Sequence, residues 1–164
     1  MIVRFEIDLP DGDTITESEL AQRGEAEKLL AGMDSPEGGL VLSNPATGQS
    51  TAVGDMLGAL INRFCFQSIP VLAADREYST RLFQYPEQVS MAPEGDEVVV
   101  TGDEIDPSRY PKRELLPALV ACGERYAAYL RKLHGDDPNW AGRLETLETA
   151  AKNARAQLPA ATTA

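Results

Sequence analysis

Basic residues are missing from a long stretch of this chain, since seven acids and no lysine or arginine lie between Arg81 and Arg109. Residues 1–108 hold 20 acids and 6 bases, whereas residues 109–164 hold 6 acids and 9 bases. The formal net charge of −11 exceeds what solubility requires. Binding to nucleic-acid phosphates or to an anionic membrane depends on clustered lysine and arginine, so the sequence argues against both kinds of partner.

Cysteine, histidine and long hydrophobic runs are equally scarce. The two cysteines, Cys65 and Cys122, stand among apolar neighbours, which predicts reduced thiols in the core of a cytoplasmic protein. No segment approaches the roughly 20 apolar residues that a membrane helix needs. The alternating N-terminus is typical of a strand and not of a signal peptide.

The length and the pattern of the chain predict one α+β domain over residues 1–158, followed by a flexible tail at 159–164. We expect a small, mostly antiparallel sheet with a C-terminal antiparallel helical hairpin. Strands are predicted at 2–8, 38–42, 69–73, 78–85, 88–92 and 97–101. Helices are predicted at 16–31 and 53–65.

The helical hairpin has the clearest signal. Leu115, Leu119, Cys122, Tyr126, Leu130 and Leu133 recur every three or four residues, as do Trp140, Leu144, Leu147, Ala151, Ala154 and Leu158. Pro117 is expected in the first turn of the first helix, and Gly135 at its end. Asp137 and Pro138 are expected to begin the second helix as its N-cap and first residue.

Few residues have the character of catalytic groups. His134 could bind a metal or act as a base with Asp136 or Asp137, but its position also fits the C-terminal end of a helix dipole. A thiol nucleophile at Cys65 or Cys122 is disfavoured by their apolar surroundings. No Gly-rich phosphate loop or Gly-x-Ser-x-Gly motif is present, so we expect no catalytic residues and no cofactor.

The acidic loops leave two interpretations open. Asp8, Asp11 and Asp13, and separately Asp103, Glu104 and Asp106, could hold a divalent cation for a metal-dependent hydrolase or transferase, although neither segment fits the calcium-loop motif. Alternatively, acidic side chains attract a basic protein partner, with aromatic residues as anchors. For this second interpretation the predicted partner-binding residues are Tyr85, Glu94, Asp96, Glu97, Asp103, Glu104, Asp106 and Tyr110.

In its size, its acidic run over residues 94–106 and its order of a β-hairpin followed by helices, the chain resembles bacterial toxin-immunity proteins. This resemblance implies a small non-enzymatic α+β protein that neutralises a toxin by occupying a positively charged cleft. Carboxylates would then stand in for the phosphates of the toxin's substrate. A dimeric structural adaptor or chaperone, paired through the C-terminal helices, is the further alternative.

Overall fold

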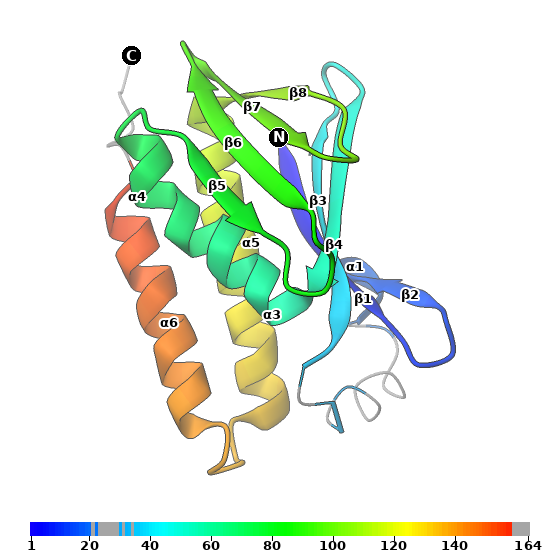
Figure 1. Cartoon of the computed structure of the whole chain (residues 1–164). Helices are drawn as coiled ribbons and strands as arrows, with labels where there is room; N and C mark the ends of the chain where they lie inside the picture. The colour runs from blue at the N-terminus through cyan, green and yellow to red at the C-terminus, as the bar shows by residue number, and fades with distance from the viewer. Residues whose placement is uncertain (21, 23–29, 31, 34, 159–164) are drawn as a thin grey trace.

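Two antiparallel sheets of four strands each make up the β part of the computed structural model, which describes residues 1–20, 22, 30, 32–33 and 35–158 (Figure 1). Sheet A has the order β2 (Thr14–Thr16), β1 (Ile2–Asp8), β3 (Glu37–Asn44) and β4 (Gln49–Met56). Sheet B has the order β5 (Tyr78–Arg81), β6 (Gln88–Glu94), β7 (Glu97–Gly102) and β8 (Ser108–Pro111).

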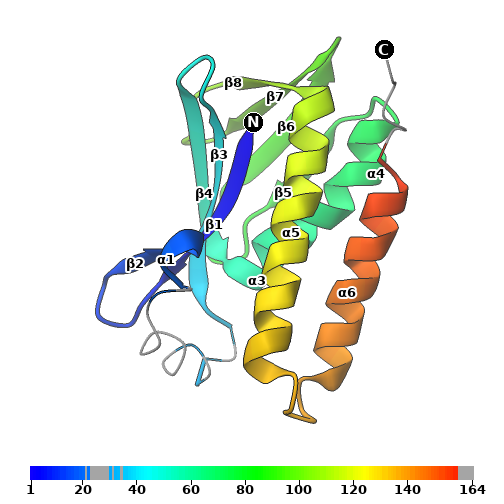
Figure 2. The same ribbon diagram turned by 180° about the vertical axis from the view of Figure 1, so that it is seen from behind.

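The helices cover one side of these sheets (Figures 1 and 2). A short helix α1 (Glu17–Leu20) follows β2. A continuous helical segment joins the two sheets and consists of α3 (Leu57–Leu60), the π-helix η1 (Ile61–Gln67) and α4 (Ser68–Ala73). The chain then continues after sheet B with α5 (Lys112–His134) and α6 (Ala141–Ala156). Among the described residues, no helix combines the length and the apolar character needed to cross a membrane.

The predicted α+β class and the C-terminal helical hairpin are confirmed. Helix α6 runs back along α5, and the predicted stripe residues Leu119, Leu130, Leu144 and Ala154 are buried. The strands predicted at 2–8, 88–92 and 97–101 are also confirmed, although the strands are divided between two sheets. Most of the helix predicted at 16–31, and the tail predicted at 159–164, lie outside the described residues.

Two segments in the middle of the chain were assigned wrongly. Residues 53–56 belong to β4, where Val53 pairs with Leu40, and the helix begins only at Leu57. The apolar residues of this stretch fit both the helical period and the alternation of a strand, and the pairing with β3 decides for the strand. Residues 69–73, predicted as a strand, continue the helical segment in α4. A short apolar run cannot by itself distinguish a buried strand from a buried helix.

Two predicted helix boundaries were also wrong. Helix α5 begins at Lys112, so Pro117 lies beyond its first turn, where it removes the hydrogen bond to the Arg113 carbonyl. Helix α6 begins only at Ala141. Asp137 therefore does not cap it; its carboxylate accepts a hydrogen bond of 2.9 Å from the Asn139 N–H in the turn between the helices.

Helix α5 is the central element of the core. It contacts β1 of sheet A, β7 and β8 of sheet B, the helical segment that joins the sheets, and α6. Ten of its residues are buried, from Leu115 near its start to His134 at its end. Helix α5 thus fixes how the two sheets and the other helices lie relative to one another.

The closest approach between α5 and the helical segment is at Gly123. A Cβ atom placed there would lie 2.5 Å from the ring of Phe66 and 2.8 Å from the Cβ atom of Cys65, both on η1. These separations are shorter than carbon atoms tolerate, so the helices can pack this closely only because residue 123 has no side chain.

We predict that Gly123→Ala lowers the free energy of unfolding by about 1–3 kcal/mol, because the added methyl group must displace the buried Phe66 ring. Urea denaturation measures the change. Gly142→Ala is the control, since a Cβ atom at that helical position has no neighbour within 4 Å. Equal stability of the two variants would contradict the packing argument.

Candidate functional site

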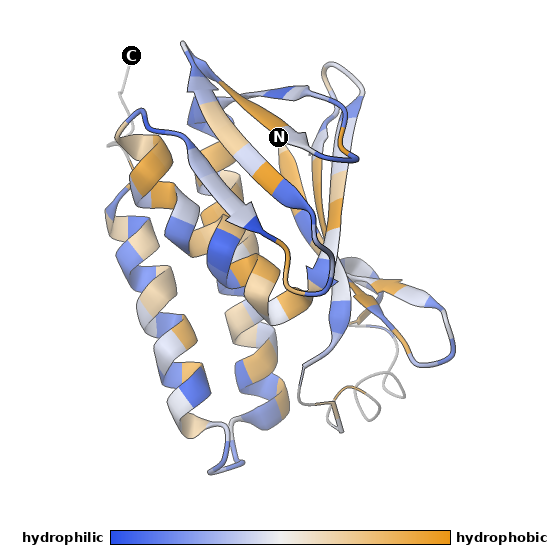
Figure 3. Cartoon of the chain, viewed as in Figure 1, coloured by the Kyte–Doolittle hydropathy of each residue, from blue (hydrophilic) through white to orange (hydrophobic). Residues whose placement is uncertain are grey.

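The loop of residues 82–87, between β5 and β6, presents two aromatic side chains to solvent. Phe83 is 73% exposed and Tyr85 is 50% exposed, whereas most large hydrophobic side chains of the described structure are buried. The loop is closed by a hydrogen bond of 2.9 Å from the Leu82 N–H to the Glu87 carbonyl. Figure 3 shows its hydrophobic segment directly after β5.

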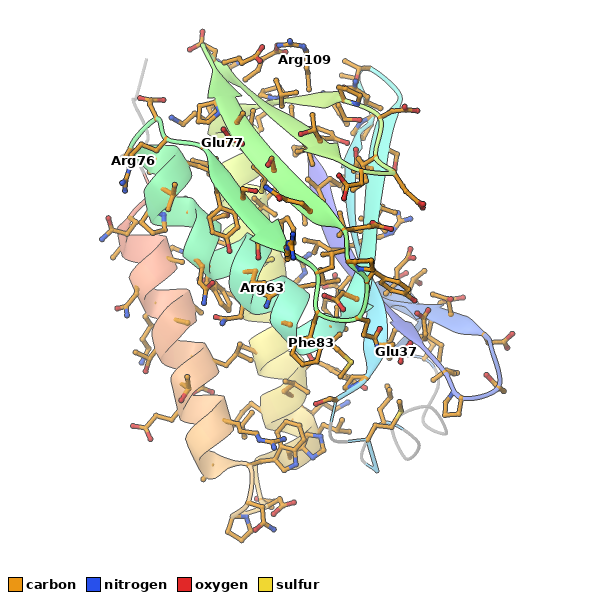
Figure 4. The ribbon with its side chains drawn as sticks, viewed as in Figure 1. Glu37, Arg63, Arg76, Glu77, Phe83 and Arg109 are labelled. Atoms are coloured by element: carbon orange, nitrogen blue, oxygen red, sulfur yellow. The ribbon has the colours of Figure 1, made fainter. Side chains whose placement is uncertain are left out.

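A buried carboxylate fixes this loop to sheet A. Asp55, at the end of β4, is only 2% exposed and accepts hydrogen bonds from the backbone N–H groups of Phe83 and of Gln84, the latter at 2.9 Å. The Gln84 side chain donates to Glu37 at 2.7 Å. Figure 4 shows Phe83 and Glu37 close together beside α3. The aromatic side chains are therefore exposed on a backbone that is held in place.

The loop after β7 lies at the same end of sheet B, because Gly102 pairs with Val89 across the sheet. Asp103 accepts a hydrogen bond of 3.1 Å from the Gln88 N–H, which ties the two loops together. Glu104 and Asp106 are exposed, and neither has an ion pair within the part of the chain that the structure describes. Three of the predicted acids thus lie at the same end of the sheet as Tyr85.

The other three predicted acids lie at the opposite end of β7, which is roughly 20 Å long for its six residues. Arg109 pairs there with Glu94 at 2.7 Å and with Glu97 at 3.4 Å, and both carboxylates raise the pKa of its guanidinium. Figure 4 shows Arg109 far from Phe83. The six acids therefore do not form one surface, and two of them are already paired with Arg109.

Tyr110 cannot be a surface anchor, which corrects the prediction for this residue. It is fully buried, and its hydroxyl donates to the Thr51 hydroxyl at 2.7 Å and lies 3.3 Å from the Leu42 carbonyl. Thr51 and Leu42 belong to sheet A, whereas Tyr110 belongs to β8. The side chain joins the edges of the two sheets instead of contacting a partner.

The histidine and both cysteines are buried in the core. His134 is 5% exposed at the end of α5, and its ring stacks on Trp140 with centroids 3.8 Å apart. Cys65 and Cys122 are buried, free thiols that contact each other. Burial, together with the hydrogen bond to Cys122, raises the pKa of Cys65 well above its usual value, so this thiol is protonated at neutral pH.

No group of three or more histidine, cysteine or acidic side chains is arranged to hold a metal ion among the described residues. In the N-terminal acidic turn, Asp8 accepts a hydrogen bond from Thr14, and Asp11 accepts one from the Asp13 N–H. These contacts are those of a hydrogen-bonded turn. The enzymatic alternative thus gains no candidate cation site in the described part of the chain.

We predict that Asp55→Asn destabilises the fold by about 1–3 kcal/mol, because an amide nitrogen cannot accept and one loop N–H loses its partner. Hydrogen exchange at the Phe83 and Gln84 amides should also become faster. Asp96→Asn is the control, since Asp96 is exposed and its side chain makes no hydrogen bond within the described part of the chain. Unchanged exchange at both amides would show that Asp55 does not hold the loop.

We predict that neither cysteine reacts with a thiol reagent at neutral pH until the chain is unfolded, because both are buried and Cys65 is held protonated. A raised pKa in the folded state also means that this thiol opposes folding at alkaline pH, where the unfolded thiol ionises more readily. Labelling with and without denaturant provides the measurement. Rapid labelling of the folded protein would contradict the assignment of both thiols to the core.

In comparisons with protein-family models, curated proteins and solved structures, the chain matched none of them. Its function must therefore be argued from its own residues.

Proposed function

We propose that this chain is a non-enzymatic binding protein that recognises a basic protein partner through the loops at one end of sheet B. We call this region the loop surface and define it by Phe83, Tyr85, Asp103, Glu104 and Asp106. The observation that carries the proposal is the backbone of residues 83 and 84, which the buried Asp55 holds in place. The exposed Phe83 and Tyr85 lie in this loop, at the same end of sheet B as Glu104 and Asp106, which have no ion pair in the described part of the chain.

This combination suits protein recognition for two physical reasons. Aromatic side chains contribute most to binding when they enter a desolvated pocket of the partner, and a fixed backbone lowers the entropy lost on binding. Carboxylates at the rim increase the rate of association with a basic partner and discriminate against acidic ones. Because Glu104 and Asp106 have no ion pair within the described structure, their charge is available to a partner.

The partner that best fits this chemistry is a toxin domain with a positively charged cleft. A cleft that binds a phosphate-bearing substrate presents basic side chains, and the carboxylates of Asp103, Glu104 and Asp106 match such groups in charge. The chain would then act as an immunity protein. The apolar stripes of α5 and α6 are already buried within the chain, which favours this proposal over an adaptor that dimerises through them.

The test compares two triple variants with the same change in charge. The first, Asp103→Asn with Glu104→Gln and Asp106→Asn, neutralises the loop surface. We expect it to slow association with the partner by roughly tenfold at low salt and to reduce the dependence of the rate on ionic strength. The partner is first captured from a native lysate at low salt, eluted by stepwise salt and identified by mass spectrometry.

The matched control is Glu94→Gln with Asp96→Asn and Glu97→Gln, which removes three charges at the other end of β7. We expect this variant to bind the partner nearly as fast as the unchanged protein, because these acids lie at the other end of β7 and Arg109 offsets part of their charge. Equal losses in both variants would mean that only the net charge matters. Absence of any stoichiometric basic partner would contradict the proposal.

A further inference from the structure

A groove with a volume of about 420 Å³ lies among α3, the second half of α5 and the start of α6. Its walls are largely apolar and include Met56, Phe83, Leu130, Trp140 and Leu147. The volume falls within the range of sites that bind small molecules. None of its lining residues is acidic, which sets it apart from most of this acidic chain.

The first polar group of the groove is a tyrosine hydroxyl. Tyr126 is 2% exposed, its ring packs edge-on against Phe5, and it lines the groove. Its hydroxyl makes no hydrogen bond to any residue that the structure describes. Burial raises the pKa of Tyr126, and Tyr129 adds to the rise, so the hydroxyl keeps its proton. Although the ring is buried, the hydroxyl oxygen itself is not fully enclosed by the protein. It can therefore donate a hydrogen bond to a ligand in the groove.

The chain leaves access to this hydroxyl at Gly58. Gly58 lies exposed in α3 and also lines the groove, and a Cβ atom placed there would lie 3.9 Å from the Tyr126 oxygen. No other atom lies within 4 Å of that position. A side chain at residue 58 would therefore fit the fold but partly cover the hydroxyl.

The second polar group is a cation. The guanidinium carbon of Arg143, on the first turn of α6, lies 5.2 Å from the centre of the Trp140 ring, and Arg143 lines the groove. Its side chain makes no ion pair with the residues that the structure describes. Arginine donates hydrogen bonds and cannot accept them, and a protonated tyrosine in this position is available as a donor. The groove therefore offers donors and a positive charge to a ligand that supplies acceptors.

We propose that this groove binds a small carboxylic acid with an apolar body and a second oxygen distant from the carboxylate. The apolar body packs against Met56, Leu130 and Trp140. The carboxylate pairs with Arg143, and the second oxygen accepts the hydrogen bond of Tyr126. The polar contacts of this proposal come from Tyr126 and Arg143, which are not part of the loop surface; Phe83 is the one residue that both sites include.

The test uses three related probes and the folded full chain. The first probe is 3-(4-hydroxyphenyl)propionate, the second lacks its phenolic oxygen, and the third carries an alcohol in place of its carboxylate. Affinities come from chemical-shift titrations, which also show where each probe binds. We expect the first probe to bind most tightly, with shifts confined to α3, the end of α5 and the start of α6.

Each variant should abolish the gain in affinity that one polar group of the probe provides. Tyr126→Phe should weaken the first probe about three- to tenfold and leave the second unchanged, since only the first offers an acceptor to the hydroxyl. Gly58→Ala should also weaken binding of the first probe, because the added methyl group partly covers the hydroxyl. Arg143→Gln should weaken both acids about two- to fivefold and leave the alcohol unchanged. Tyr126→Phe removes a hydroxyl that has no hydrogen-bond partner among the described residues, so the melting temperature of this variant should not fall.

Two controls carry the same chemical changes at other positions. Arg113→Gln removes a positive charge at the other end of α5, and Gly142→Ala adds a methyl group at a helical position that does not line this groove. Neither should change the affinities. The proposal would be overturned if none of the three probes bound, or if the shifts lay outside the groove. It would also be overturned if Tyr126→Phe and Arg143→Gln bound the first probe as tightly as the unchanged protein does.

Discussion

The close packing of α5 against η1 at Gly123 is the constraint on which the rest of the structure depends. A single Cβ atom at this position would overlap the Phe66 ring, so the separation of the two helices is set by the absence of a side chain. Because α5 also contacts β1, β7 and β8, that separation determines how far the helical segment lies from both sheets. Protein interiors are packed too tightly to absorb a shift there without changes elsewhere.

Both candidate sites follow from this arrangement of the core. One turn after Gly123, Tyr126 extends from α5 toward the exposed Gly58 of helix α3, which begins directly where β4 ends. The last buried residue of β4 is Asp55, and its carboxylate holds the loop that carries Phe83. The groove and the loop surface thus meet where sheet A passes into the helical segment. Phe83 belongs to both, since it lines the groove and stands on the anchored loop.

The parts of the fold that could be predicted from the sequence are those with a long, regular pattern. The stripes of α5 and α6 extend over several turns, and no other structure satisfies such a period. Strand β8 escaped prediction because it is four residues long and follows an acidic loop, and so the burial of Tyr110 was missed. The anchored loop was missed for another reason: Asp55 and Phe83 are 28 residues apart, and nothing local marks their contact. The available signal is the alternation of Asp55 with the buried Thr51 and Val53, which the helical interpretation of residues 53–56 hides.

The shared side chain Phe83 connects the two proposals energetically. If a partner covered the loop surface, the 73% exposure of Phe83 would be lost, and if a ligand filled the groove, the contacts of Phe83 would change. The factor by which a ligand changes the affinity for the partner must equal the factor by which the partner changes the affinity for the ligand. Because Asp55 fixes the backbone of Phe83, only the side chain is free to respond, and the coupling is limited to what one aromatic ring contributes. The charges of the two sites are opposite as well, so an anion in the groove and a basic partner on the loop surface do not compete for the same groups.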